Sequence, residues 1–362
     1  MEFIDLKKQY QLYKEEIQEE FNKVLTSASF INGPAVKELE KQLAEYVGVK
    51  HAIGCSSGTD ALLLSLMVKE VKPGDEVLIP DFTFVATAEV VALIGAVPVF
   101  IDIKPDTYNI NPVLIEQKIT DRTKGIIPVS LYGQCADFDE IQAVASKNSL
   151  WVIEDGAQSF GATYKGKKSC SITEIGTTSF FPAKPLGCYG DGGAVFTNDD
   201  SIAEKLLMLR NHGQERRYFH KIIGVNGRLD SIQAAVIKVK LKHFDDEMKR
   251  KQDIARIYTD RLKNVVKTPV IKEFNYSVWA QYTVQTEKRD EIVNHLRTKG
   301  IPIAIHYPKP LHIQEAFTGF SNVNGNYPIS EKASREVFSL PMHPFLEEKD
   351  IDFICNSIKE AL

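Results

Sequence analysis

Short apolar runs and longer amphipathic runs follow one another in a regular order over the first 245 residues. The short runs are typical of strands buried on both faces, and they span residues 75–80, 97–103, 124–133 and 150–155. Helical spacing of apolar positions lies between and around them, at residues 58–71, 87–96, 112–119 and 137–149. This order predicts a mostly parallel central sheet with helices on both faces. In such sheets ligands bind at the carboxyl ends of the strands.

The pattern changes after residue 173. Two further strands are predicted within residues 177–181 and 192–199, and a helix follows from residue 201, where Ser201 and Glu204 have capping-box spacing. A charged amphipathic stretch over 238–264 then leads to shorter elements. We therefore expect two domains, a large one over residues 1–245 that includes the N-terminal segment, and a smaller C-terminal α+β domain over 246–362.

Composition narrows the possible partners. The chain has 362 residues, of which 43% are hydrophobic, and a formal net charge of -4, so nothing favours binding to nucleic acid or to an anionic membrane. No apolar run approaches the ~20 residues that span a bilayer. The five cysteines include no C-x-x-C pair and the eight histidines lack ligand spacing, which argues against a metal site. We expect a cytoplasmic protein without a targeting segment.

Lys184 stands in an unusual setting, "SFFPAKPLGCYGDGGA" (residues 179–194). Its neighbours are aromatic, small or proline residues, and four glycines follow it. Desolvation lowers the pKa of a lysine and makes its amine a better nucleophile and Schiff-base former. The glycines would let the backbone pass close to a bound planar group. The alternative is a surface lysine whose amine reaches solvent from a glycine-rich loop.

A carboxylate at a strand end and a helix start support a chemical role for Lys184. Asp155 closes the apolar run 150–155, where a carboxylate needs a cation or hydrogen-bond donors, although it could simply cap a turn. Gly58 and Thr59 open the helix at residue 58, whose free N–H groups could bind a phosphate or could belong to an ordinary capped helix. Together, an amine, a strand-end carboxylate and a phosphate site are the parts that pyridoxal phosphate (PLP) requires.

The sequence resembles the DegT/DnrJ/EryC1/StrS family of PLP-dependent sugar aminotransferases, which have fold type I. The resemblance covers nearly the whole chain. It is carried by "FINGPAVKELEKQLAEYVGVKHAIGCSSGTDAL", "PDFTFVATAEVV", "PVSLYGQCADFDEI", "VIEDGAQSFGA", "SFFPAKPLGCYGDGGAVFTND" and "VNGRLDSIQAAVIKVKL". One departure is Gly156, where alanine is more usual in the family.

The resemblance implies a role for each matching residue. Lys184 would form the Schiff base and Asp155 would pair with the pyridine nitrogen. The other cofactor contacts would come from Gln158 and Phe84 on the two faces of the ring, from Gly58, Thr59 and Ser179 at the phosphate, and from Asn226 of the second subunit of a homodimer with shared active sites. Substrate contacts would come from Arg228, His306 and Tyr307. Arg228 could instead form an ion pair with Asp230.

The resemblance also implies a reaction. Within the family, the chain is most similar to enzymes that aminate C3 of a UDP-linked 3-keto-N-acetylhexosamine or its uronic acid, with L-glutamate as amino donor, for bacterial surface glycan or lipopolysaccharide synthesis. Three alternatives stay open: a C4 aminotransferase acting on a 4-keto-6-deoxy sugar nucleotide, a PLP-dependent sugar dehydratase, and a non-catalytic PLP-binding regulator. A dehydratase would have histidine in place of Lys184, and no segment that would bind DNA is visible for a regulator.

Overall fold

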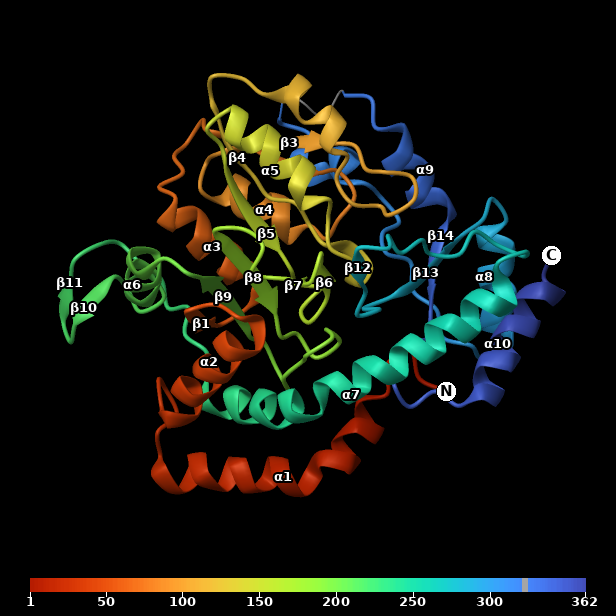
Figure 1. The fold of residues 1–362 in the computed structure, drawn as a ribbon, viewed down its shortest axis with the longest axis horizontal. Helices are drawn as coiled ribbons and strands as arrows, with labels where there is room; N and C mark the ends of the chain where they lie inside the picture. Colours follow the sequence, from red (N-terminus) through yellow and green to blue (C-terminus); the bar gives the residue numbers. More distant parts are fainter. Residues whose placement is uncertain (321–324) are drawn as a thin grey trace.

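A seven-stranded sheet forms the centre of the protein (Figure 1) in the computed structural model, which describes residues 1–320 and 325–362. The strand order is β1-β9-β8-β5-β4-β2-β3. The strands are β1 (His51–Cys55), β2 (Glu76–Pro80), β3 (Val97–Ile101), β4 (Thr123–Ile126), β5 (Trp151–Asp155), β8 (Ile175–Ser179) and β9 (Gly193–Thr197). Only β9 is antiparallel to its neighbours in this sheet. The predicted mostly parallel sheet is confirmed.

Helices cover both faces of this sheet, as predicted. One face packs against α2 (Pro34–Val47), α5 (Phe138–Lys147) and the first half of α7 (Ser231–Leu262). The other packs against α3 (Gly58–Val68), α4 (Ala86–Leu93) and α6 (Asp200–Leu209). Successive strand residues point to opposite faces, so Val152 and Ile153 of β5 belong to different hydrophobic cores. Double burial explains why the strands are continuous apolar runs.

The C-terminal part has a core of its own. The second half of α7 packs there with α8 (Arg289–Thr298), α10 (Glu348–Glu360), β13 (Tyr282–Gln285) and β14 (Val337–Leu340). Helix α9 (Pro328–Glu336) precedes β14. Because α7 runs unbroken through positions 245 and 246 and contributes to cores on both sides, the boundary between the domains at that position stays a prediction.

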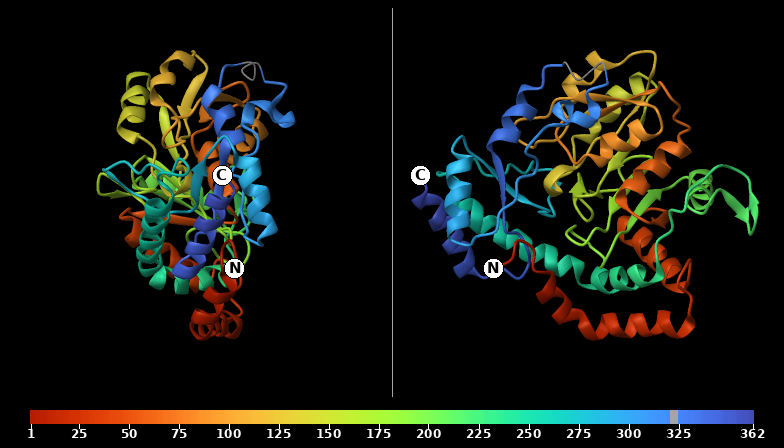
Figure 2. Two further views of the ribbon diagram at one scale, coloured as in Figure 1. Left: turned by 90° about the vertical axis from the view of Figure 1, so that its right-hand side faces the viewer. Right: turned by 180° about the vertical axis from the view of Figure 1, so that it is seen from behind.

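Two elements lie outside this body. Helix α1 (Leu6–Ser27) runs along α7, and the hairpin of β10 (Gln214–Arg216) and β11 (Phe219–His220) extends away from the sheet in Figure 1 and in the right-hand view of Figure 2. A small sheet of β12 (Asn275–Tyr276), β6 (Thr163–Tyr164) and β7 (Lys167–Lys168) lies near the junction of the two parts. Within the described residues, no helix combines the length and the apolar character needed to cross a membrane.

Two local predictions were wrong. Residues 112–119 form two short 3₁₀ helices, Pro112–Leu114 and Glu116–Lys118, instead of one α-helix. Ile115 is buried there, with Leu114 and Ile119 packed against the same core, but Val113 is 72% exposed. Helix α6 begins one residue earlier than expected, because Asp199 is its N-cap and accepts hydrogen bonds from the backbone N–H groups of Ser201 and Ile202 at 2.8 and 3.0 Å.

Glu154 is a fully buried carboxylic acid in β5, on the face of the sheet that carries Val152. Its carboxyl oxygens accept hydrogen bonds from Ser169 Oγ at 2.6 Å and from the backbone N–H of Cys170 at 2.7 Å. Burial nevertheless raises its pKa to about 7. The acid is therefore protonated in the folded protein at a pH where it is ionised in the unfolded chain.

This difference predicts that stability depends on pH through Glu154. Folding binds a proton at Glu154 between its ordinary pKa and pH 7, so the stabilisation is complete at low pH and is lost as pH rises to about 7. Relative to Glu154→Gln, the wild type should lose roughly 2–3 kcal/mol of unfolding free energy between pH 5 and pH 8. Urea titrations at both pH values measure this. Glu273→Gln, at an exposed position, is the control and should not change the pH dependence.

Candidate active site

Nine of the residues singled out in the sequence line one cavity of about 450 Å³ at the carboxyl ends of the parallel strands. They come from α3, from the loops that follow β2, β5 and β8, and from the segment that precedes β14 in the C-terminal part. They are Gly58, Thr59, Phe84, Asp155, Gln158, Ser179, Lys184, His306 and Tyr307. The volume falls within the range of about 300–1,000 Å³ that is usual for small-molecule sites.

Lys184 lies on the loop between β8 and β9. Its backbone N–H donates to the carbonyl oxygen of Phe181 at 2.8 Å, and the side chain is enclosed by the cavity. Burial lowers the pKa of the Lys184 amine, although the carboxylate of Asp155 opposes the shift. The amine is therefore deprotonated, and nucleophilic, at a lower pH than a surface lysine.

The glycines after Lys184 serve the loop itself. A Cβ on Gly187 would lie 2.4 Å from the carbonyl oxygen of Pro182, and one on Gly192 would lie 3.0 Å from Leu229 Cδ1. Gly187 and Gly192 therefore let the loop fold against its own backbone and against Leu229, which precedes α7. The expectation that these glycines let the backbone pass close to a bound planar group stays a prediction.

Asp155 is buried at the end of β5. One carboxyl oxygen accepts a hydrogen bond from Thr87 Oγ1 at 2.8 Å, and the other accepts one from the backbone N–H of Ala157 at 3.1 Å. Burial raises the pKa of Asp155 despite these donors and the positive charge of Lys184. A protonated ring nitrogen beside this carboxylate would stabilise its charged form.

Gly156, which follows Asp155, occupies the position where the family more often has alanine. A Cβ at this position would lie 2.7 Å from Cys170 Sγ and 2.9 Å from the carbonyl oxygen of Thr177. The cysteine sulfur therefore takes the room that an alanine methyl would need, and the departure leaves Asp155 unaltered.

The amino end of α3 fits a phosphate group. Ser57 caps the helix by accepting from the N–H of Asp60 at 3.0 Å, and the first-turn N–H groups of Gly58 and Thr59 have no acceptor within the helix. A Cβ on Gly58 would come within 2.6 Å of Ser179 Cβ. The absence of a side chain at residue 58 thus lets the helix end approach Ser179, and the cradle between them suits the phosphate of PLP.

Gln158, His306 and Tyr307 also line the cavity. Gln158 accepts from the backbone N–H of Tyr132 at 2.9 Å and donates to the Tyr307 hydroxyl at 3.0 Å, so its amide is fixed. His306 Nδ1 lies 3.0 Å from Ser339 Oγ, and burial lowers the pKa of the imidazole to about 4, which keeps it neutral. Phe84 is half exposed and faces into the same cavity.

Asn226 and Arg228 do not join this cavity in the same chain. Asn226 is exposed, on the segment between the hairpin and α7. Arg228 donates to Asn211 Oδ1 at 2.9 Å, and its Nε is buried without a hydrogen-bond partner among the described residues. Arg228 lines a separate open cavity of about 580 Å³ under the hairpin. Arg228 therefore contacts Asn211 and not Asp230, the alternative partner considered from the sequence.

Of the residues at the site that were missed in the sequence, Thr87 and Gln281 bear most directly on its chemistry. Thr87 lies inside the quoted stretch "PDFTFVATAEVV", but its hydrogen bond to Asp155 joins positions 68 residues apart and leaves no local signal. Gln281 also lines the cavity, from the loop before β13. The segment "WAQYTVQT" reads as strand, and nothing in it distinguishes this glutamine from a solvent-facing one.

The chain is similar to known proteins along its whole length. The sequence profile of the DegT/DnrJ/EryC1/StrS aminotransferase family matches residues 11–359. A UDP-2-acetamido-2-deoxy-3-oxo-D-glucuronate aminotransferase from Pseudomonas aeruginosa is 52% identical over 99% of this chain and 99% of its own. A UDP-N-acetyl-3-dehydro-alpha-D-glucosamine 3-aminotransferase from Acidithiobacillus ferrooxidans is 41% identical over 99% of this chain and 97% of its own.

Solved structures agree with this similarity. A DegT DnrJ EryC1 StrS aminotransferase from Brucella abortus superposes with a TM-score of 0.97 at 46% identity and covers 99% of both chains. The PLP form of the sugar aminotransferase Spr1654 from Streptococcus pneumoniae superposes with a TM-score of 0.90 at 28% identity, over 96% of this chain and 96% of its own. The predicted α/β architecture of fold type I is confirmed.

The geometry predicts that Lys184 is the lysine that PLP modifies. After incubation with PLP and reduction with borohydride, mass spectrometry should find the reduced pyridoxyl group on the peptide that contains Lys184. The Lys184→Ala protein should lack this modified peptide. Lys251→Met is the matched control, because Lys251 is also buried with a pKa lowered to about 8 but lies outside the cavity. A modified Lys251 in place of Lys184 would contradict the assignment.

Proposed function

This chain belongs to the DegT/DnrJ/EryC1/StrS aminotransferase family, and we propose that it aminates C3 of a UDP-linked 2-acetamido-3-oxo sugar with L-glutamate as donor. The observation that carries the proposal is one cavity in which Lys184, Asp155 and the amino end of α3 lie together. The 52% and 41% identical relatives both act on UDP-linked sugars of this kind.

The enzyme is a PLP-dependent nucleotide-sugar aminotransferase. Bound PLP supplies an aldehyde that exchanges amino groups and a ring that accepts electrons from the reacting carbon. Asp155 would hold the ring nitrogen in its protonated form, and Thr87 orients that carboxylate. The first-turn N–H groups of α3 and the Ser179 hydroxyl would bind the phosphate, and Phe84 and Gln158 would contact the ring.

Lys184 moves the proton in both half-reactions. Its amine, with a pKa lowered by burial, takes the proton from the amine-bearing carbon of glutamate and later returns a proton to C3 of the sugar. Glutamate leaves as 2-oxoglutarate, and the ketosugar leaves as the 3-amino sugar. A histidine at this position could not form the Schiff base, which separates this chain from the related dehydratases.

The part of the cavity lined by Gln158, His306 and Tyr307 receives the sugar. His306 is neutral and Tyr307 is held by Gln158, so both offer fixed hydrogen-bonding groups to hydroxyls. The described lining includes no arginine from the same chain. Arg228, whose Nε lacks a partner, would therefore reach a C6 group only from a second subunit.

The test of the function is turnover. UDP-N-acetylglucosamine and its uronic acid, each oxidised at C3 in situ, are offered with glutamate, and 2-oxoglutarate is measured. We expect turnover of at least one, with faster turnover of the uronic acid if Arg228 binds a C6 carboxylate. A visible spectrum of bound PLP without turnover of either sugar would contradict the proposal and would favour the C4 enzyme or a regulator.

We further propose that the enzyme is a homodimer with shared active sites. The Asn226 side chain is exposed and its segment runs beside the phosphate cradle, where Ser56 N–H donates to Gly227 O at 3.1 Å. Large apolar side chains are also exposed around it, among them Ile223 at 88% and Tyr218 at 75%. A second copy of the chain would cover these side chains and receive Asn226 at its cofactor phosphate.

Mixed dimers test this sharing. A dimer of one Lys184→Ala subunit and one Asn226→Ala subunit would have one site with both defects and one intact site if Asn226 reaches across. Mixing the two weak variants should then restore up to half of the activity per dimer, provided that subunits exchange. If mass spectrometry confirms mixed dimers and no activity returns, Asn226 acts within its own chain.

A further inference from the structure

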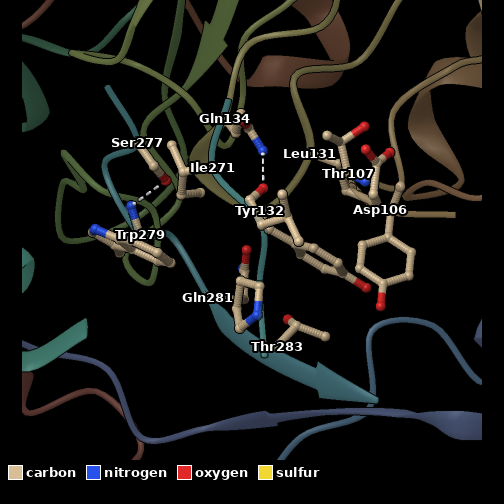
Figure 3. Close-up of a pocket in the computed structure, with 13 residues that line it drawn as sticks. Asp106, Thr107, Leu131, Tyr132, Gln134, Ile271, Ser277, Trp279, Gln281 and Thr283 are labelled. Carbon is tan, nitrogen blue, oxygen red and sulfur yellow. Dashed lines mark hydrogen bonds between the residues drawn. The ribbon is translucent and has the colours of Figure 1, made fainter. Parts of the chain in front are cut away.

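Gln281 occupies the boundary between the active-site cavity and a smaller cavity behind it. It lines both, and the smaller one is walled by aromatic and aliphatic side chains that include Tyr132, Trp279 and Ile271 (Figure 3). The preceding residue, Ala280, lines a further small cavity together with Ala183 and Lys184. Gln281 therefore enters the active site next to the loop that carries Lys184.

The amide of Gln281 has no hydrogen bond within the described residues. Its Oε1 is buried and unpartnered. Other glutamines nearby differ: Gln134 bonds to Val270 O and the N–H of Lys272, Gln158 to Tyr132 and Tyr307, and Gln285 to Tyr108 and Glu336. A buried polar atom without a partner costs about 1–3 kcal/mol. A leucine at this position would avoid that cost, so the filling of space alone does not account for the amide.

The remaining hydrogen-bonding groups of the cavity narrow the ligand group that Gln281 binds. Asp155 is assigned to the ring nitrogen of PLP. The Gln158 amide already accepts one hydrogen bond from Tyr132 and donates one to Tyr307. Gln281 is thus the uncommitted amide among the described lining residues. The unpartnered Oε1 is an acceptor, so it requires an N–H or O–H donor. The carboxylates of glutamate are acceptors only, whereas the N–H of the acetamido group of the sugar is a donor.

We propose that Gln281 recognises the 2-acetamido group of the sugar, with its Oε1 accepting a hydrogen bond from the acetamido N–H. The inference rests on the proposed function, in which the reacting C3 lies next to C2. A residue that enters the cavity beside Lys184 is close to the reacting carbon and hence to the substituent on its neighbour. Gln281 would therefore make the enzyme select 2-acetamido sugars over sugars that carry no hydrogen-bond donor at C2.

The Gln281→Leu variant tests this role, because the amino sugar and glutamate react in two separate half-reactions and only the amino sugar carries the acetamido group. The UDP-linked 2-acetamido-3-amino sugar is reacted with the PLP enzyme in single turnovers, and glutamate is reacted separately. Loss of this hydrogen bond should lower the apparent second-order rate constant for the amino sugar roughly 10-fold. The rate with glutamate should stay within about twofold. For an analogue with hydrogen in place of the acetamido group at C2, wild type and variant should react at similar rates.

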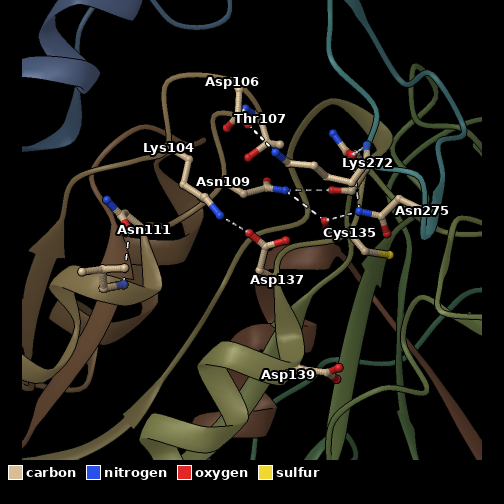
Figure 4. Close-up of polar contacts among 12 residues, drawn as sticks. Lys104, Asp106, Thr107, Asn109, Asn111, Cys135, Asp137, Asp139, Lys272 and Asn275 are labelled. Atoms are coloured by element: carbon tan, nitrogen blue, oxygen red, sulfur yellow. Dashed lines mark hydrogen bonds and ion pairs between the residues drawn. The ribbon is translucent and has the colours of Figure 1, made fainter.

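Gln134→Leu is the matched control. Gln134 lines the same small cavity, but its amide is bonded to the segment around Lys272, in the network that joins Asn109, Cys135 and Asn275 (Figure 4). Its loss should lower the unfolding midpoint without changing the ratio of the two half-reactions. Gln281→Leu should leave the midpoint unchanged or raise it, because an unpartnered polar atom is removed.

Three outcomes would overturn the inference. They are an equal loss in both half-reactions, an unchanged rate with the acetamido sugar, and destabilisation of Gln281→Leu to the extent seen for Gln134→Leu. Failure of the proposed function is distinct from these, because the wild-type enzyme would then not react with the amino sugar at all. If the wild-type enzyme reacts with the amino sugar but Gln281→Leu slows both half-reactions equally, only the role of Gln281 is refuted.

Discussion

The burial of a carboxylate and an amine in one cavity is the constraint on which the site depends. Desolvation raises the pKa of Asp155 and lowers that of Lys184, so each group is pushed towards its neutral form. Two hydrogen bonds to Asp155 offset part of this cost. A cationic ring nitrogen would offset the rest, and a neutral Lys184 amine is what Schiff-base chemistry requires. The cost of burying these two groups would thus be offset by the cofactor.

The sheet maintains this arrangement because successive residues of β5 point to opposite faces. Asp155 reaches the cavity beside α3, while Glu154 enters the core on the α5 and α7 side and meets Ser169 and Cys170. Two adjacent acids therefore have separate surroundings, one a polar site and the other a sealed core. A shift of one residue in register would exchange them.

Under the proposed function, one chain alone would supply an incomplete site. The cavity contains a cofactor cradle and fixed neutral groups for a sugar, but the arginine that could meet a charged C6 group lies under the hairpin. Exposed apolar side chains on that hairpin and the buried, unpartnered Nε of Arg228 are both features that a second copy of the chain would satisfy. Substrate choice would then depend on two interfaces, the C-terminal part with Gln281 in one subunit and the hairpin region of the other.

The sequence by itself determined the layered α/β architecture, because burial on both faces of a sheet leaves continuous apolar runs that helices separate. It also pointed to Lys184, Asp155 and Gly58, since a lone charge or a glycine in an apolar setting is a local signal. The tertiary structure decided the remainder. Thr87 and Gln281 became visible only when segments far apart in the chain met, and Asn226 and Arg228 proved to lie outside their own chain's cavity. Hydrogen bonds and the lack of them depend on such long-range proximity, which local patterning does not encode.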